Sequence, residues 1–325
     1  MKITTKEIKN SIKILFIPYC LLFIPAEAAM YDNTEASTIS DTIPKSNTYF
    51  NTKNPSTKLD YTPSYSTKKT EMTQAFRFIV NKQLPEAKKL INKIITNSPT
   101  SPHGYILNAM LGLAEGKDQQ VKDNFSKALT LNKKNITALH GLADLAVKQG
   151  DLEQAKKYHQ TILEINDKYA KSYFALAHIA LKQNKIQKVE ALLIKAYDLA
   201  KGNLPFQLSI STDLAKHYIK QKKLNKLSKL SDELVKQYPE NNAALLFKVN
   251  SFIINKDITS AENLLKKLIK SEPNRSEYKI RLANILSKLD SRKIEIIPLL
   301  DKIITENPNK IQSYAFKTHH LINLK

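Results

Sequence analysis

Residue types that could do chemistry are few in this chain of 325 residues, and their spacing forms no catalytic motif. The sequence has no Gly-x-Ser-x-Gly elbow, no Gly-rich phosphate loop and no His-Glu-x-x-His pair. His319 and His320 form the only adjacent histidine pair, but neighbours on a helix point about 100° apart and are poorly aimed at one ion. We therefore expect no catalytic residue, no metal and no cofactor, with these histidines as a solvated pair and His159 as a packed core residue.

Residues 1–28 are typical of a secretory signal peptide. Four lysines precede an apolar run over residues 14–24, and a small-x-small cleavage sequence follows over residues 26–28. A retained membrane anchor is the alternative, but the run is shorter than the roughly 20 residues that span a bilayer. Cleavage near Ala28 predicts an exported protein, periplasmic or secreted, that has lost its single cysteine, Cys20.

Residues 29–67 differ in composition from the rest of the chain. They are rich in Ser, Thr, Asn and Pro and show no apolar period. Such a segment cannot bury enough apolar surface to offset the entropy of ordering it. We expect a disordered tether here.

The chain is strongly basic, with 51 Lys and Arg against 30 Asp and Glu and a net charge of +21. Residues 1–28 hold four lysines and two glutamates, so their removal leaves +19. Arginine, which grips bases and phosphates with a bidentate fork, is rare. It occurs only at Arg77, Arg275, Arg281 and Arg292. Because the lysines are scattered, solvated faces are favoured over specific nucleic-acid binding, and peripheral contact with an anionic surface stays open.

One pattern returns at a fixed interval along most of the chain. Residues 150–167 and residues 184–201 place apolar or small side chains at matching steps, and within each unit two stretches with helical spacing flank a tight turn. Ala143 and Ala155 fall where two helices of a hairpin cross most closely. A lone hairpin cannot bury its apolar stripe but stacked copies can, so the pattern predicts an all-α repeat protein.

The interval and the unit resemble the tetratricopeptide repeat, whose period is about 34 residues. That repeat has a large residue at position 4, small ones at 8 and 20, a bulky one at 24 and often Pro at 32. The resemblance implies a right-handed superhelical solenoid of antiparallel helix hairpins, with about seven repeats over residues 68–310 and a capping helix over 311–325. The units are expected to start at Pro102, Ile136, Ala170, Leu208, Asn242 and Ser276, with four extra residues around "KGNLP" (201–205) and one in the "LDSRK" turn (289–293).

In the family, positions 2, 5, 9 and 12 of each first helix line a concave groove. The resemblance therefore places a binding groove at His103, Ile106, Met110, His140, Asp144, Lys171, Phe174, His178, Lys216, Leu246 and Asn250. The family's carboxylate clamp, Lys at position 5 with Asn at position 9, is not matched, since Asn250 stands with Leu246. Two further readings are that some of these side chains are ordinary core, and that the aromatic stretch Tyr49–Tyr65 folds back into the groove.

These features predict a non-catalytic protein–protein interaction scaffold of the bacterial cell envelope. Its partner would be an amphipathic helix or an extended apolar peptide from another protein. The alternative is a basic adaptor that binds an anionic polymer or a membrane surface through its positive charge.

Overall fold

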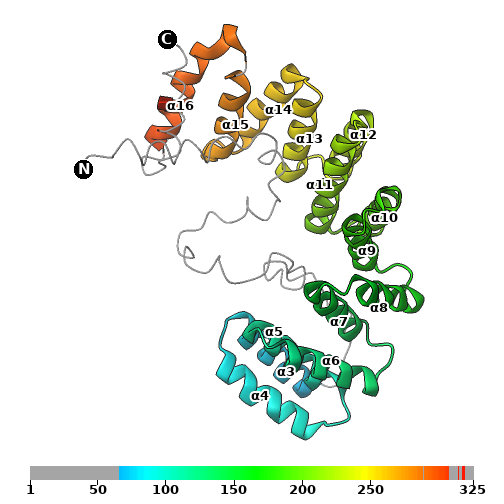
Figure 1. Cartoon of the computed structure of the whole chain (residues 1–325). Helices are drawn as coiled ribbons and strands as arrows, with labels where there is room; N and C mark the ends of the chain where they lie inside the picture. The colour runs from blue at the N-terminus through cyan, green and yellow to red at the C-terminus, as the bar shows by residue number, and fades with distance from the viewer. Residues whose placement is uncertain (1–65, 288, 307–313, 315–316, 319–325) are drawn as a thin grey trace, which may run out of the picture. The chain divides into compact units, whose positions relative to one another are not determined.

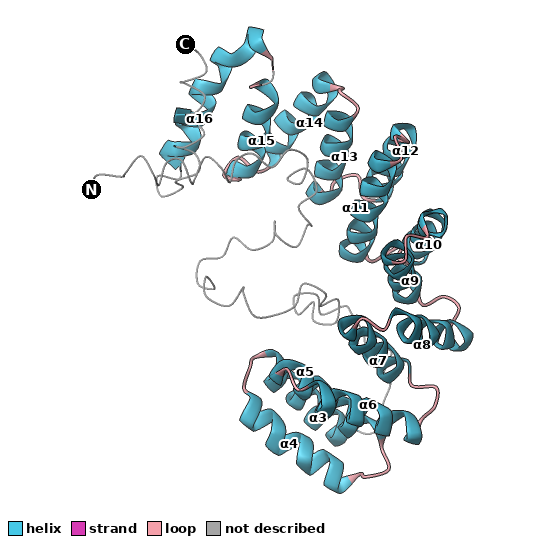
Figure 2. Ribbon diagram, viewed as in Figure 1, coloured by secondary structure: helices cyan, strands magenta, loops and turns pink. Residues whose placement is uncertain are grey.

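A computed structural model describes residues 66–287, 289–306, 314 and 317–318 of the chain (Figure 1). The predicted signal peptide, nearly all of the predicted tether and most of the predicted capping helix lie outside these residues. The described part consists of helices and loops and contains no strand (Figure 2). None of its helices combines the length and the apolar character needed to cross a membrane.

The described helices pair into consecutive antiparallel hairpins, and helix contacts join the two members of each pair. The pairs are α3 (Ser66–Val80) with α4 (Leu84–Asn97), α5 (Pro102–Glu115) with α6 (Asp118–Leu131), α7 (Ile136–Gln149) with α8 (Leu152–Ile165), α9 (Ala170–Lys182) with α10 (Ile186–Leu199), α11 (Leu204–Lys220) with α12 (Leu224–Gln237), α13 (Asn242–Ile254) with α14 (Ile258–Ser271), and α15 (Ser276–Leu286) with α16 (Ile296–Glu306). The prediction of an all-α helical repeat is confirmed.

The hairpins belong to two compact units, which meet in the chain between Lys201 and Gly202. The described part of the N-terminal unit contains α3 to α10, and that of the C-terminal unit contains α11 to α16. This boundary falls within the "KGNLP" stretch, where extra residues lengthen the spacing of the sequence pattern.

The turns inside the first six described hairpins, from α3–α4 to α13–α14, repeat a single backbone conformation. A residue with positive φ stands at Lys82, Gly116, Gly150, Asn184, Lys222 and Lys256. In each case the next amide donates to a carbonyl five residues earlier, as in Lys117 N–H to Gly112 O at 2.8 Å and Asp151 N–H to Ala146 O at 2.9 Å. This is the Schellman arrangement, which satisfies carbonyls left open at a helix end and reverses the chain. The period of the sequence is therefore also a period of the backbone.

The centre of each hairpin is packed at the predicted small positions. The eighth residue of each unit is at most 1% exposed, at Ala75, Ala109, Ala143, Ala177, Ala215, Val249 and Ala283. Facing positions on the second helices, such as Ala87 and Ala155, are also fully buried. Small side chains here let the two helix backbones approach closely, and that approach brings the larger side chains of the stripe into contact.

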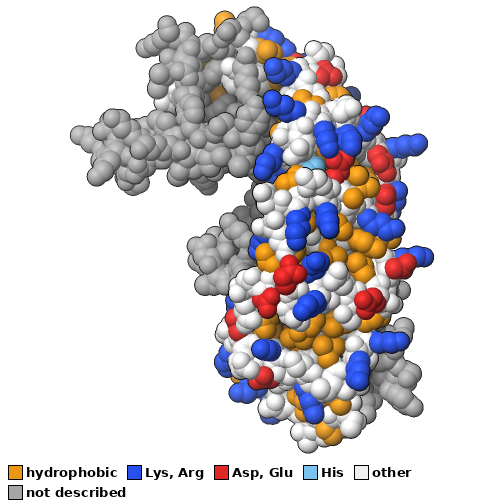
Figure 3. Space-filling model, turned by 45° about the vertical axis from the view of Figure 1, so that its right-hand side comes forward, with side chains coloured by type: hydrophobic (Ala, Val, Ile, Leu, Met, Phe, Trp, Pro, Cys, Tyr) orange, Lys and Arg blue, Asp and Glu red, His pale blue; other side chains and the backbone are white. Residues whose placement is uncertain are grey.

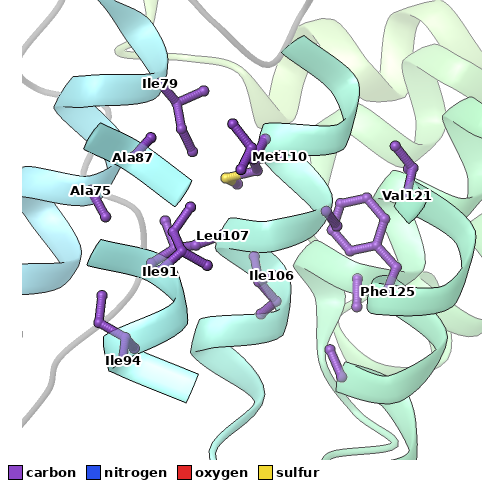
Figure 4. Close-up of a cluster of buried hydrophobic side chains, with 14 of the residues drawn as sticks. Ala75, Ile79, Ala87, Ile91, Ile94, Ile106, Leu107, Met110, Val121 and Phe125 are labelled. Atoms are coloured by element: carbon purple, nitrogen blue, oxygen red, sulfur yellow. The ribbon is translucent and has the colours of Figure 1, made fainter. Parts of the chain in front are cut away.

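A continuous apolar cluster joins α3, α4, α5 and α6. Figure 4 shows Leu107 and Met110 of α5 on the side facing Ile79 and Ile91, which come from α3 and α4. Phe125 of α6 is 2% exposed and belongs to the same cluster. The stripe of one hairpin is thus covered by the next hairpin along the chain.

The four extra residues near "KGNLP" extend a helix, which differs from the expected start at Leu208. α11 begins at Leu204 and has 17 residues, whereas the other first helices that begin within the described part have 11 to 14. Pro205 lies in the first turn of α11, where its missing N–H costs no helical hydrogen bond. The Asn203 side chain caps the helix by accepting a hydrogen bond from the Phe206 amide. Four residues are close to one helical turn, so the insertion keeps Ala215 on the buried face.

The C-terminal unit buries polar groups in bonded networks. The amide of Gly202 donates to Tyr238 Oη at 3.1 Å, which in turn donates to Gln207 Oε1 at 2.9 Å. Gln207 is fully buried, and its amide donates to Gln237 Oε1 at 2.9 Å. These bonds fix the start of α11 against the end of α12.

An ion pair joins the last two hairpins, where the extra residue of the "LDSRK" turn lies in a 3₁₀ helix, η2 (Asp290–Glu295). Arg292 on η2 donates from Nη2 to Glu262 Oε1 at 3.0 Å and also pairs with Glu295. The Glu262 side chain is 9% exposed and the Glu295 side chain 50%. The bond from Arg292 lowers the pKa of Glu262 to about 2.

Gly141 of α7 packs closely against Phe125 of the preceding hairpin and provides a test of that contact. A Cβ added there meets the Phe125 ring, at 2.7 Å from Cδ2 and closer still to Cε2 and Cζ. We expect Gly141→Ala to lower the free energy of unfolding by about 1–3 kcal/mol, because the ring has no room to move away. Urea denaturation followed by far-ultraviolet circular dichroism measures the loss. In a double-mutant cycle with Phe125→Leu, the double variant should lose less stability than the two single variants added together; simple additivity would contradict the contact.

The Glu262 pair predicts a pH-dependent contribution to stability. A carboxyl whose pKa is depressed in the folded state stabilises the fold above its unfolded value, near pH 4.5, and this is lost as the pH falls towards about 2. Glu262→Gln should lower the thermal midpoint by about 2–4 °C near neutral pH. The difference in thermal midpoint between this variant and the unaltered chain should disappear in acid. Glu295→Gln removes an exposed partner of the same arginine and should have a smaller effect; equal effects would show that burial of Glu262 is irrelevant.

Candidate binding site on the first helices

The predicted groove residues divide between the two units. His103, Ile106, Met110, His140, Asp144, Lys171, Phe174 and His178 lie on α5, α7 and α9 of the N-terminal unit, and Lys216, Leu246 and Asn250 lie on α11 and α13 of the C-terminal unit. The two sets are therefore considered separately. The N-terminal set holds most of the polar and aromatic side chains.

Four of the predicted residues are buried, in line with the alternative reading of core. Ile106 and Met110 are 8% and 9% exposed and belong to the apolar cluster of α3 to α6. His140 is 3% exposed. Asn250 is 5% exposed, and its Oδ1 accepts a hydrogen bond from Arg281 Nη1 at 3.1 Å. Their position on the helix was predicted, but side chains of other helices cover them, including His159 of the same hairpin in the case of His140.

The remaining C-terminal residues are engaged locally. Lys216 is exposed and pairs with Asp213, three residues earlier on the same helix, at 3.0 Å. Leu246 is half-buried and packs against the apolar cluster of α13 to α16. Nothing in their contacts joins them into one site.

The N-terminal residues that keep accessible surface gather on α7 and α9. Asp144 on α7 and Lys171, Phe174 and His178 on α9 are half-buried or exposed. We call these four residues the α7–α9 face. The rings of Phe174 and His178 lie one turn apart on α9, with centroids 4.5 Å apart. His103 on α5 is half-buried and contacts Ser101 Oγ through Nδ1 at 2.9 Å, at the start of its own helix.

Buried histidines lie next to the α7–α9 face. His140 Nδ1 is 3.7 Å from Asp144 Oδ1, and the His140 ring stands edge-on to the rings of His159 and Tyr169 at centroid distances of 5.3 and 5.8 Å. His159 of α8 is fully buried, as predicted, and its Nδ1 lies 3.2 Å from Ser172 Oγ of α9. His159 Nε2 has no hydrogen-bond partner within the described residues. Three helices thus enclose a compact polar cluster.

Burial controls the charges in this cluster. Desolvation lowers the pKa of His159 to about 4 and holds that of His140 well below its usual value, so both rings are neutral near pH 7. Desolvation raises the pKa of Asp144 to about 7, partly opposed by the positive charge of Lys171. It also lowers the pKa of Lys171, and Asp144 opposes that shift in turn. The face therefore presents one cation and a carboxyl group that is half protonated near neutral pH.

This arrangement suits recognition by hydrogen bonds. Lys171 offers an ammonium donor, and Asp144 offers a donor or an acceptor according to its protonation. Phe174 adds an aromatic surface beside them. No group of three or more His, Cys, Asp or Glu in the described part of the chain is placed to hold a metal ion.

Two members of the cluster were not singled out in the sequence, Tyr169 and Ser172. The signal that could have found them is His159 itself, which occupies the bulky position of its repeat. A buried imidazole needs a polar neighbour, and the nearest candidates are the first polar residues of the following repeat. Ser172 is the third residue of that repeat.

The sequence matches a model of the tetratricopeptide repeat over residues 112–179, from the end of α5 to α9. No curated protein matches the sequence significantly. The family match therefore covers all four residues of the α7–α9 face but only part of the chain.

Solved structures resemble the fold at low sequence identity. The C-terminal part of a TPR repeat-containing protein from Cytophaga hutchinsonii has a TM-score of 0.56 and 14% identity, covering 75% of this chain and 98% of that one. PilF from Pseudomonas aeruginosa has a TM-score of 0.50 and 16% identity, covering 67% and 97%. PilW, described as a type IV pilus biogenesis factor, has a TM-score of 0.50 and 12% identity, covering 67% and 100%. These likenesses support the helical-repeat fold.

Asp144 provides a test of the charge state of the site. Its pKa is raised in the folded state, so its ionisation costs stability as the pH rises from about 4 to about 7. Asp144→Asn should therefore raise the free energy of unfolding near pH 8, by about 1 kcal/mol because the side chain keeps 35% exposure and solvent screens the cost. Near pH 4 the variant should show no gain.

The matched control is Asp123→Asn, at an exposed carboxylate on α6 that accepts a bond from Gln119 of its own helix. Thermal melts of both variants across this pH range make the comparison. A pH-independent effect of Asp144→Asn, or an equal gain from the control, would contradict burial as the cause.

Proposed function

We propose that this chain, a helical-repeat protein whose residues 112–179 match the tetratricopeptide repeat, is a non-catalytic interaction scaffold that binds a segment of a partner protein on the α7–α9 face. Tetratricopeptide repeats generally serve as non-catalytic scaffolds. The observation that carries the proposal is the set of accessible charged and aromatic side chains on α7 and α9, next to buried ionisable groups.

The polar character of this face narrows the kind of partner. The predicted apolar anchors Ile106 and Met110 are committed to the core, so they offer little surface to an apolar peptide. Lys171 and Asp144 instead favour a segment with polar side chains, and Phe174 favours an apolar or aromatic neighbour within it. The partner segment proposed here is therefore mixed, with a polar residue beside an apolar one.

We place this function in the bacterial cell envelope. The support is the signal-like sequence of residues 1–28 and the similarity of fold to PilF and to the type IV pilus biogenesis factor PilW. Cleavage near Ala28 and a periplasmic or secreted location are part of the proposal.

The alternative, an adaptor for an anionic polymer or membrane surface, draws its support from the net charge of +21. On the surface seen in Figure 3, however, Lys and Arg are scattered among hydrophobic and acidic side chains and form no continuous stripe. Several basic side chains are also paired with carboxylates, as in Lys148 with Asp118 at 2.5 Å and Arg292 with Glu262. The charge therefore favours general attraction over a defined polyanion site.

Site-specific crosslinking tests the proposal. A photoreactive amino acid at position 174 should capture a defined protein in the cells where the chain is natively made, whereas the same group at Lys157, exposed on α8, should not. Lys171→Glu should reduce the capture at position 174 by about tenfold, the effect of losing roughly 1.4 kcal/mol of binding free energy. Mass spectrometry identifies the product.

Salt separates the two candidate functions. Binding on the α7–α9 face should weaken little with ionic strength, because its contacts are partly buried, whereas polyanion affinity falls steeply. Identical products at positions 174 and 157, or capture abolished equally by neutralising any surface lysine, would favour the anionic-surface alternative.

A further inference from the structure

We infer that the acidic segment of this chain over residues 29–44 docks on the α7–α9 face and occupies it in competition with a partner. The inference rests on the proposed function, since it uses the same surface. It names an occupant that the chain itself carries.

The charge distribution of the chain supports this occupant. Residues 29–44 contain Asp32, Glu35 and Asp41 and no Lys or Arg. The whole chain has 51 basic and 30 acidic residues. Residues 1–65 hold only seven of the basic and six of the acidic residues, so the part from residue 66 onward carries a large positive excess. An acidic segment next to such a surface is attracted to it at long range.

The α7–α9 face supplies specific partners for a carboxylate. Lys171 is half-buried, and burial lowers its pKa, so a carboxylate placed beside it restores the stability of the ammonium form. Asp144 is half protonated near neutral pH and in that state donates an O–H bond to an incoming carboxylate. The rings of His140 and His159 are neutral, so they add no positive charge that would compete with Lys171 for the carboxylate.

The segment also carries apolar side chains at a useful spacing. Ile39 and Ile43 flank Asp41, at distances of two residues on each side. An extended segment places these three side chains on one side of the backbone, because alternate residues share a face. A carboxylate between two apolar groups matches Lys171 and Phe174, which are three residues apart on α9 and therefore lie on the same side of the helix.

The length of chain allows the contact. Residues 45–65 separate the acidic segment from Ser66, where α3 begins, and when extended they span up to about 70 Å. Adjacent packed helices lie 8–10 Å apart, so α9 is on the order of 30 Å from α3 across the successive first helices of the N-terminal unit. The chain is long enough without any rearrangement of the hairpins.

The absence of tryptophan from the sequence allows a clean reporter. Phe174→Trp introduces a single indole into the full chain at the proposed contact. Acrylamide quenching measures its exposure, and circular dichroism checks that the variant folds. Combining it with charge reversal of the segment, Asp32→Lys, Glu35→Lys and Asp41→Lys, should raise the quenching constant by about twofold or more, since the attraction that holds the segment becomes repulsion.

Matched variants control for changes in charge alone. Lys171→Gln should raise the quenching constant as the charge reversal does, whereas Lys182→Gln, at an exposed position of the same helix, should not. Asp144→Asn keeps a donor without a charge and should leave the indole protected. Adding a synthetic peptide of residues 29–44 to the charge-reversed chain should restore protection.

An unchanged quenching constant after charge reversal, with no protection by the added peptide, would overturn the inference. Crosslinking of a partner at position 174 is a separate measurement, so the scaffold function can hold while the docking of residues 29–44 fails. If both hold, the charge-reversed chain should capture more partner than the unaltered chain.

Discussion

The structure depends on one constraint: a helix hairpin in this chain can bury its apolar stripe only against the next hairpin. The small residues at the crossing point, such as Ala143 and Ala155, bring the helices close enough for that stripe to form. The turn with a positive φ then returns the chain at a fixed length. Sequence, turn conformation and buried contacts consequently share one period, because each is a condition for docking the following copy.

Much of the fold could be predicted because these conditions are local in sequence. The expected unit starts at Pro102, Ile136, Ala170, Asn242 and Ser276 coincide with the first residues of α5, α7, α9, α13 and α15. The start of α11 was misplaced because a stretch with Gly, Asn and Pro is typical of a loop. Tertiary packing favoured a longer helix, since one added turn leaves every buried side chain on the same face.

The candidate site could be predicted only in part, because position on a helix does not determine depth. The spacing rule places both Met110 of α5 and Phe174 of α9 on the predicted groove face of their helices. The rule does not predict that Met110 is covered by side chains of α3 and α4. Nor does it predict that Phe174 keeps accessible surface beside His178. Depth is set by the volumes of side chains in other hairpins, and these vary from repeat to repeat while the period stays constant.

The two units also differ in how their buried polar groups are satisfied. In the C-terminal unit Gln207, Ser211 and Thr212 are satisfied by bonds to neighbouring side chains or to their own helix, so they serve packing. In the cluster beneath the α7–α9 face, His159 keeps one ring nitrogen without a hydrogen-bond partner in the described part of the chain, and Asp144 has its ionisation opposed by burial. Both features lower stability, but His159 is fully buried, so only the cost at Asp144 can be offset by a ligand that binds on the surface. Asp144 is the member of this pair that keeps accessible surface, so a partner bound at the proposed site would offset the cost of burying its carboxyl group.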